Sequence, residues 1–159
     1  MIPHHSGTIE SVTEQTSSGI VAPELQTARL LLRRPRLDDA DAYYEIASDP
    51  AYARFGSRGD VDRQNQTAAL GYGIGRAWWG SGFATEAAKA ALDYAFEGLD
   101  VDKVWARADP RNVGSLRVLE KIGMQREGVL RSHLIYRGER VDRVYFGLLR
   151  NEWAVGRGQ

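Results

Sequence analysis

The sequence contains no cysteine, and this absence removes several kinds of chemistry at once. Without a thiol the chain forms no disulfide, offers no thiolate nucleophile and builds no cysteine-based metal site. The formal net charge is zero, because 21 basic residues balance 21 acidic ones. No run approaches the roughly 20 apolar residues that a membrane-spanning helix needs. We therefore expect a protein that does not act at a membrane and is not held to nucleic acid by bulk charge.

The first residues offer little that folds or binds. Residues 1–24 are polar and have no sustained hydrophobic period, which predicts a flexible N-terminal arm. They also lack the basic start and apolar stretch of a secretory signal, so we expect a cytoplasmic protein. His4 and His5 are adjacent in this arm, where they make a poor metal site, and we predict no metal. Residues 25–159 have the length of a single domain.

The remaining chain alternates between strand-like and helix-like segments. Aliphatic residues predict a strand at 29–34, and apolar residues at helical spacing predict a helix at 37–49. Residues 56–67 carry one aliphatic side chain, Val61, which predicts a loop. Further strands are predicted at 68–75, 103–108, 126–136 and 141–149, and further helices at 84–98 and 112–123. This order is typical of an α/β or α+β protein.

Gly80 and Gly82 stand directly before the strongest helical segment. Glycine weakens a helix by about 1 kcal/mol relative to alanine, so its placement here needs a reason. A glycine turn before a helix N-terminus forms an anion site, because the first helical N–H groups have no partners within the helix. Without a Cβ, both residues allow a phosphate to approach the backbone. A plain turn before a core helix is the alternative interpretation.

Spacing separates the known glycine-rich phosphate sites. A P-loop requires a lysine directly after its last glycine, and neither glycine here is followed by one. A Rossmann turn requires a third glycine or alanine where this chain has Thr85. Asp109 nevertheless lies after the next predicted strand, where an acid that binds a ribose could stand. A dinucleotide-binding site therefore remains an alternative that the sequence supports less well.

Four stretches together resemble the GNAT superfamily of acyl-CoA-dependent N-acetyltransferases, and specifically its RimJ/RimL-like branch. They are LQTARLLLRRPRLDDADA (25–42), LGYGIGRAWWGSGFATEAAKAALDYAF (70–96), NVGSLRVLEKIGM (112–124) and EGVLRSHLIYRGERVDRVYFGLLRNEW (127–153). The resemblance implies a GNAT-like fold in which helices flank a mixed central sheet. It also implies that two of the usual antiparallel strands are missing between residues 55 and 68. The first strand would then need a new neighbour, for which a second subunit of a homodimer is one source.

The glycine stretch resembles the segment that holds the pyrophosphate of acetyl-CoA in this superfamily, written Q/R-x-x-G-x-G/A. Gly82 and Ala84 match that pattern, whereas Trp79 stands where Gln or Arg is usual. The resemblance implies acetyl-CoA as the cofactor, with its pantetheine arm between the diverging strands 70–75 and 103–108. The implied cofactor-binding residues are Trp79, Gly80, Ser81, Gly82, Phe83, Ala84 and Thr85.

The resemblance extends to three further site residues. Asn112 matches a position that contacts the cofactor, although capping the following helix explains an asparagine there almost as well. Many members protonate the leaving thiolate with a tyrosine at the position of Leu119, whereas RimL-like enzymes are thought to use a serine at the position of Ser115. Ser115 is therefore the implied proton donor and a cofactor contact. His133 lies near the branch's basic residue and is the candidate base, with a structural role as the alternative.

The implied reaction is direct transfer of an acetyl group to a primary amine, on a protein N-terminus or a small molecule. Such a transfer needs aligned reactants, a base for the amine, a donor to the oxyanion and a proton for the thiolate. It needs no protein nucleophile, which is consistent with a chain without cysteine. The alternative is a degenerate acyl-CoA-binding or interaction module that lacks turnover, because the polar run 56–67 leaves the acceptor side short.

Overall fold

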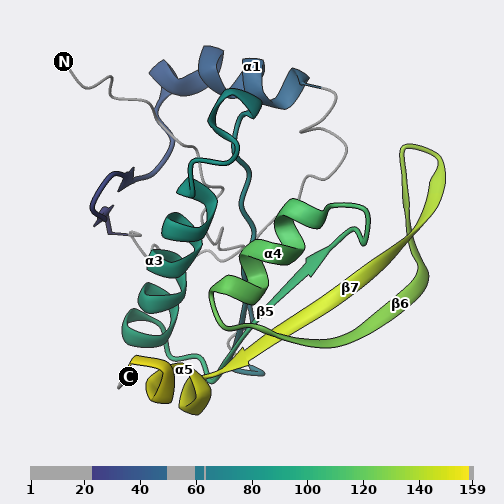
Figure 1. Cartoon of the computed structure of the whole chain (residues 1–159). Helices are drawn as coiled ribbons and strands as arrows, with labels where there is room; N and C mark the ends of the chain where they lie inside the picture. The colour runs from purple at the N-terminus through teal and green to yellow at the C-terminus, as the bar shows by residue number, and fades with distance from the viewer. Residues whose placement is uncertain (1–22, 50–59, 63, 158–159) are drawn as a thin grey trace.

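A computed structural model describes residues 23–49, 60–62 and 64–157 of the chain (Figure 1). The predicted arm lies outside the described residues apart from its last two positions. Where the structure describes the chain, its elements are β1 (Leu25–Gln26), β2 (Leu31–Leu32), the short 3-10 helix η1 (Leu37–Asp39), α1 (Ala40–Ser48), β3 (Asp60–Asp62), β4 (Thr67–Ala69), the 3-10 helix η2 (Arg76–Trp78), α3 (Phe83–Gly98), β5 (Lys103–Ala108), α4 (Val113–Lys121), β6 (Gln125–Tyr136), β7 (Glu139–Leu149) and α5 (Arg150–Arg157).

A mixed sheet organises the molecule. Its strands lie in the order β3-β4-β5-β7-β6, and β1 and β2 form a separate two-stranded sheet. Strands β4 and β5 are parallel, whereas the other neighbours are antiparallel. Helices α3 and α4 lie against one face of the large sheet, and α5 lies at its end (Figure 1). The predicted mixed sheet with flanking helices is confirmed.

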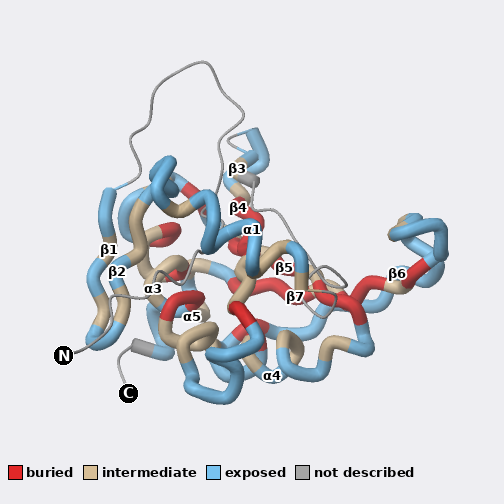
Figure 2. Tube along the Cα trace, turned by 90° about the horizontal axis from the view of Figure 1, so that it is seen from above, coloured by how far each residue is buried: buried red, intermediate tan, exposed pale blue. Residues whose placement is uncertain are grey.

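The core lies between this face of the sheet and the two helices. In β5, Val104, Ala106 and Ala108 are buried, and the residues between them are partly exposed on the other face. Leu92 and Phe96 of α3 pack into the same core from the helix side. The alternating apolar residues of the strand thus pack in one core with the helically spaced apolar residues of α3, as the apolar pattern predicted. Figure 2 shows the buried positions gathered along the middle of the molecule.

The predicted helices at 84–98 and 112–123 are confirmed together with the residues that begin and end them. Helix α3 begins directly after Gly82 and runs to Gly98, as the apolar period indicated. Helix α4 begins after Asn112, whose side chain accepts a hydrogen bond from the Ser115 N–H, and is followed by Gly123 at φ +88°. A left-handed glycine after a helix and an asparagine cap before it are the end signals that sequences use most. The hairpin β6–β7 is also confirmed, with its turn at residues 137–138.

The prediction of a loop throughout 56–67 is wrong for residues 60–62. They form β3, which pairs antiparallel with β4 through a turn in which Asp62 accepts hydrogen bonds from the backbone and side chain of Asn65. An edge strand needs backbone partners more than apolar side chains, so its polar sequence concealed it. Val61, its one aliphatic residue, packs against the core. Residues 56–59 and 63 lie outside the described residues.

Two predicted strands are much shorter than expected. Only Leu31–Leu32 of the segment 29–34 is a strand, and its neighbour is β1 of the same chain rather than another subunit. Of the segment 68–75 only the start is paired, because the chain separates from β5 after the Leu70 N–H bonds the Trp105 carbonyl at 2.8 Å. Helix α5 was not predicted. In the part of the chain described, no helix has the length and apolar character needed to cross a membrane.

Candidate functional site

The separation of β4 from β5 opens the cavity in which the predicted site residues meet. Pairing between the two strands extends from Thr67 to Leu70, after which residues 70–74 form one wall and Ala106–Ala108 the other. The starts of α3 and α4 complete the lining, and the cavity volume is about 580 Å³. A gap between two parallel strands leaves backbone N–H and C=O groups facing it, so an extended ligand with amide groups can pair there as an added strand does.

The glycine turn delivers the N-terminus of α3 to this cavity. Gly80 and Gly82 have φ values of +78° and +81°, a left-handed conformation that residues with a Cβ rarely adopt. The first bond across the start of the helix joins the Glu86 N–H to the Gly82 carbonyl at 3.1 Å. The N–H groups before Glu86 therefore have no partner within the helix. Gly80, Gly82, Phe83, Ala84 and Thr85 all line the cavity, whereas Ser81 does not.

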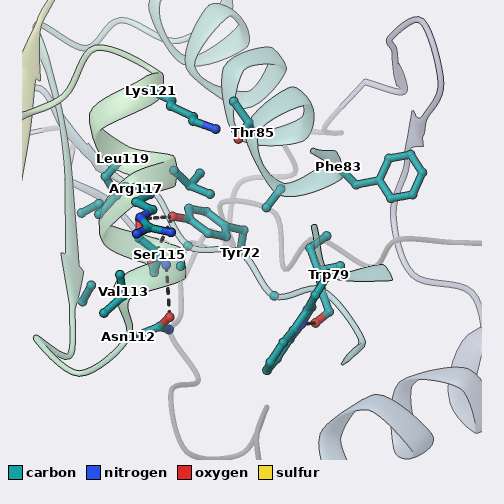
Figure 3. Close-up of a pocket in the computed structure, with 18 of the residues that line it drawn as sticks. Tyr72, Trp79, Phe83, Thr85, Asn112, Val113, Ser115, Arg117, Leu119 and Lys121 are labelled. Carbon is teal, nitrogen blue, oxygen red and sulfur yellow. Dashed lines mark hydrogen bonds between the residues drawn. The ribbon is translucent and has the colours of Figure 1, made fainter. Parts of the chain in front are cut away.

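Trp79 has a structural bond that the sequence did not reveal. Its indole Nε1 donates to the Ile74 carbonyl at 2.7 Å, and the ring lines the cavity while remaining half exposed. The bond ties the end of the unpaired segment 70–74 to the glycine turn. A tryptophan at this position thus holds two walls of the cavity together, and Figure 3 shows its ring at the lower margin of the site.

Ser115 lies on the opposite wall, in the first turn of α4, and is joined to Tyr72. The two side-chain oxygens are 3.0 Å apart, and the Tyr72 hydroxyl also lies 3.1 Å from the Ser115 carbonyl, to which it can donate (Figure 3). The Tyr72 proton can go either to that carbonyl or to the Ser115 oxygen, and in the second arrangement the Ser115 hydroxyl keeps its own proton for another acceptor. Asn112 lines the cavity beside them and accepts from the Ser115 N–H at 3.1 Å.

Tyr72 is the site residue that the sequence reasoning missed. Burial raises the pKa of its phenol to about 12, so it stays a neutral O–H donor at physiological pH. Leu119, where the resemblance implies a tyrosine in many members, is buried and carries no donor. No local pattern marks Tyr72, because its role depends on the contact with Ser115 across 43 positions of the chain. The Tyr72 phenol, from the segment that follows β4, thus reaches the serine, while α4 offers no phenol at Leu119.

The cavity is also strongly cationic. Four of its lining residues carry a positive charge, and none of the described lining residues carries a carboxylate. Lys121 and Thr85 face each other across the cavity, from α4 and α3 respectively (Figure 3). Arg111 is paired with Asp109, which does not itself line the cavity. The four cations, together with the free N–H groups of α3, still fit a ligand with several phosphate groups. The cationic lining residues are Arg107, Arg111, Arg117 and Lys121.

Asp109 has a structural partner instead of a ligand. Its carboxylate is buried and accepts from Arg111 Nε and Nη2 at 2.9 and 2.6 Å, and from Arg143 at 3.4 Å. The hydrogen bonds from Arg111 lower its pKa, which keeps it ionised. The Asp109 carbonyl also accepts from the Asn112 N–H at 2.8 Å and so sets the entry to α4. Because Asp109 does not line the cavity, the structure gives no support to a ribose-binding role.

His133 is not brought to the cavity. It lies exposed on β6, where its Nε2 is 3.0 Å from the Tyr145 hydroxyl and its ring meets the Tyr145 ring edge-on. Tyr145 in turn stacks on Trp105, on the face of the sheet away from α3 and α4. The structure therefore brings Ser115, Asn112 and the glycine turn together, whereas His133 is not among the residues that line the cavity.

Comparison with known proteins assigns this arrangement. Residues 56–125 match the family model described as an acetyltransferase (GNAT) domain. Over this stretch the chain is similar to GNAT acetyltransferase domains. GNAT acetyltransferases take their acetyl group from acetyl-CoA, whose phosphates and amide-containing arm match the two features of the cavity described above. The RimJ/RimL-like resemblance is confirmed by relatives of that kind.

Three similar proteins illustrate the match. The chain is 29% identical to an uncharacterized N-acetyltransferase p20 of Bacillus licheniformis, over 82% of this chain and 98% of the relative. It is 33% identical to the [ribosomal protein uS5]-alanine N-acetyltransferase of Escherichia coli, over 55% of this chain and 45% of that enzyme. A GNAT-family acetyltransferase structure from Bacillus anthracis superposes with a TM-score of 0.74 at 24% identity, covering 81% of this chain and 99% of that one.

The relatives differ in how much of their length this chain spans. Seven curated relatives that are 31–44% identical match over only 45–52% of their own length. The alignment with the p20 protein has 174 positions, which is more than the 159 residues of this chain, so that relative contains residues without a counterpart here. This agrees with the internal shortening that the sequence indicated.

Proposed function

We propose that this chain is an acetyl-CoA-dependent N-acetyltransferase that acts on a primary amine, either a protein N-terminal α-amine or a small amine. The observation that carries the proposal is the cavity between β4 and β5, which combines separated strands, the bare start of α3 and four cations without a carboxylate. The ribosomal-protein acetyltransferase among the relatives supports a protein N-terminus as the acceptor.

The residues of the cavity divide the work of holding the cofactor. The free N–H groups between Gly80 and Thr85 would hold the pyrophosphate, with Trp79 beside them. Ser81 belongs to the same turn but does not line the cavity. The backbone of residues 70–74 faces the amides of the arm. Asn112 and Ser115 stand at the start of α4, where the arm ends. Once bound, acetyl-CoA supplies a thioester whose acetyl group an amine can attack.

Ser115 is the proposed donor to the leaving sulfur. As the amine nitrogen forms its bond to the acetyl carbon, the bond from that carbon to sulfur breaks, and the sulfur gains negative charge. The Ser115 hydroxyl donates a hydrogen bond to it, and Tyr72 holds that serine in place from the strand wall. The proton lost by the amine goes to a base or to water. His133 is the base candidate that remains to be tested, and its Nε2 contacts the Tyr145 hydroxyl.

The test is an assay of coenzyme A release with a panel of amines that includes N-terminal peptides of ribosomal proteins. We expect turnover with at least one amine, and we expect Ser115→Ala to lower kcat roughly 10²- to 10⁴-fold while the KM for acetyl-CoA changes little. Tyr72→Phe keeps the ring and should lower kcat less. Binding without turnover on every amine would instead identify a degenerate acyl-CoA-binding module, and absence of binding would reject both functions.

The candidate base needs its own variant in the same assay. We expect His133→Gln to lower kcat, with little change in the KM for acetyl-CoA, if His133 accepts the proton. An unchanged kcat excludes His133 as the base.

A further inference from the structure

Arg29 lies outside the cavity lining, yet it contacts three parts of the turn that forms the proposed pyrophosphate site. It stands at the tip of the β1–β2 hairpin, which is closed by a hydrogen bond of 2.9 Å from the Thr27 N–H to the Leu30 carbonyl. From there its guanidinium reaches Glu86, Ser81 and Phe83, all at or before the first turn of α3. The resemblance accounts for the glycine turn and not for this hairpin contact.

The first contact is with a carboxylate in an unfavourable place for anion binding. Glu86 lies in the first turn of α3, close to where the proposed phosphates sit. Arg29 donates to it from the backbone N–H at 2.9 Å and from Nε at 2.6 Å, and its Nη2 lies 2.6 Å away as well. Thr27 donates to the same carboxylate at 2.6 Å. These bonds compensate the negative charge that would otherwise repel a phosphate.

The second contact orients a peptide group. Arg29 Nη1 donates to the Ser81 carbonyl at 3.0 Å. The Ser81–Gly82 peptide is trans, since the described residues contain no cis bond, so its C=O and N–H point in opposite directions. With the Ser81 carbonyl held by Arg29, the Gly82 N–H is directed to the other side, where Gly82 lines the cavity. Arg29 thereby selects which side of the turn presents donors.

The third contact fixes the guanidinium itself. Its Cζ lies 4.7 Å from the centre of the Phe83 ring, and an ideal Cβ at Gly82 would approach its Nη2 at 3.4 Å. The planar group is thus stacked on an aromatic ring while its edge donates to two acceptors, a geometry that lysine cannot reproduce. Arg29 remains half exposed, so it acts as a clamp on the outside of the turn.

We propose that Arg29 is a positioning residue for the pyrophosphate site, which neutralises Glu86 and turns the Ser81–Gly82 peptide so that its N–H faces the phosphates. This inference rests on the proposed function. It assigns to the β1–β2 hairpin, whose strands are only two residues each, the role of locking the cofactor turn.

The experiment compares two ligands, of which only one carries the pyrophosphate and the adenosine nucleotide attached to it. Binding of coenzyme A and of pantetheine, which lacks the pyrophosphate, is measured by calorimetry for the wild type and for Arg29→Met, Arg29→Lys and Arg36→Met. We expect Arg29→Met to weaken coenzyme A binding roughly 10- to 100-fold and to leave pantetheine binding unchanged. Arg29→Lys keeps the positive charge but lacks the planar guanidinium with its several N–H donors, so it should recover only part of the coenzyme A affinity. Arg36 is an exposed arginine of the same segment and is paired with Glu24, so Arg36→Met is the matched control. This variant should bind both ligands as the wild type does.

A double variant separates the two contributions. Glu86→Gln removes the charge that Arg29 compensates. The double variant Arg29→Met with Glu86→Gln should therefore bind coenzyme A more tightly than Arg29→Met alone. It should still bind more weakly than the wild type, because the Ser81–Gly82 peptide is no longer held. Equal weakening for coenzyme A and pantetheine would show a general folding defect and overturn the inference, as would wild-type affinity in Arg29→Met. If the wild type binds no coenzyme A, the proposed function fails together with this inference.

Discussion

At the scale of single residues, Asn112 shows how one side chain serves both the fold and the cavity. Its Oδ1 accepts from the Ser115 N–H at 3.1 Å and so caps α4, while the residue also lines the cavity. The sequence left these two roles as alternatives, and the geometry is compatible with both. Two substitutions at this position separate them, because the cap requires an acceptor oxygen and the cavity contains no carboxylate among its described lining residues.

We expect Asn112→Ala to lower the free energy of unfolding by about 1 kcal/mol, because the cap is lost. Asn112→Asp keeps an acceptor and should preserve stability, but it adds a negative charge to the cavity that is to hold the anionic coenzyme A and should weaken coenzyme A binding at least tenfold. Urea unfolding and calorimetry on the same two proteins provide the measurement. A destabilised aspartate variant would contradict the capping role, and undiminished binding would contradict the phosphate site.

At the scale of elements, Asp39 ties the start of α1 to the chain that follows β2. Its two carboxylate oxygens each accept a hydrogen bond of 2.7 Å from Arg33, and one of them also accepts from the Arg36 N–H at 2.6 Å. The bond from the Arg33 side chain, followed by that from the Arg36 backbone, lowers the pKa of Asp39 to about 2. An acid with a lowered pKa in the folded state stabilises the fold only while it is ionised.

The pH dependence follows from that shift. The contribution of Asp39 is fully present above its ordinary pKa near 4 and is lost as the pH falls toward 2. We expect Asp39→Asn to melt at a lower temperature than the wild type at pH 6, and we expect the two melting curves to converge near pH 2. Asp41→Asn, a change in the first turn of α1, is the control. A difference between wild type and Asp39→Asn that is constant across this range would refute the assignment.

Elements also differ in how well the sequence predicted them. Helix α3 and strand β5 carry strong apolar periods, and burial follows those periods, so both were predicted correctly. Strand β3 was missed because backbone pairing with β4 stabilises it while its side chains are mostly polar. The segment 70–74 was predicted as strand because its alternation is real, but it has no neighbour in β5 beyond the first residue. Pairing is a tertiary property, and no local pattern contains it.

The candidate site was predictable only in part, because contacts between distant residues leave no local pattern in the sequence. The glycine turn, Asn112 and Ser115 carry local signals of a helix start, and the fold brings them to one cavity. Tyr72 and Arg29 carry no such signal, because their roles depend on contacts across 43 and 52 positions of the chain. A sequence pattern can therefore identify the loop that meets a ligand more readily than the residues that hold it in position.

At the scale of the whole molecule, the cavity is the place where the fold is least complete. The sheet is continuous from β5 to β6, but β4 pairs with β5 over only a few residues before the strands separate. The wall at residues 70–74 is held by the Leu70 bond at one end and by the Trp79 indole at the other. A ligand that pairs with both walls would supply the missing neighbour and join the two halves of the sheet.

We therefore expect coenzyme A to stabilise the whole molecule and to protect these walls in particular. At 100 times its dissociation constant the ligand should add about 2.7 kcal/mol, which for a chain of this size raises the melting temperature by roughly 5–10 °C. Amide hydrogen exchange should slow at residues 71–74 and 82–85, because their N–H groups would gain acceptors, and should stay unchanged in the β6–β7 turn at residues 137–138. Pantetheine is the discriminating ligand, since it should protect residues 71–74 without protecting 82–85. Protection confined to any other part of the chain would mean that coenzyme A binds elsewhere than between the separated strands.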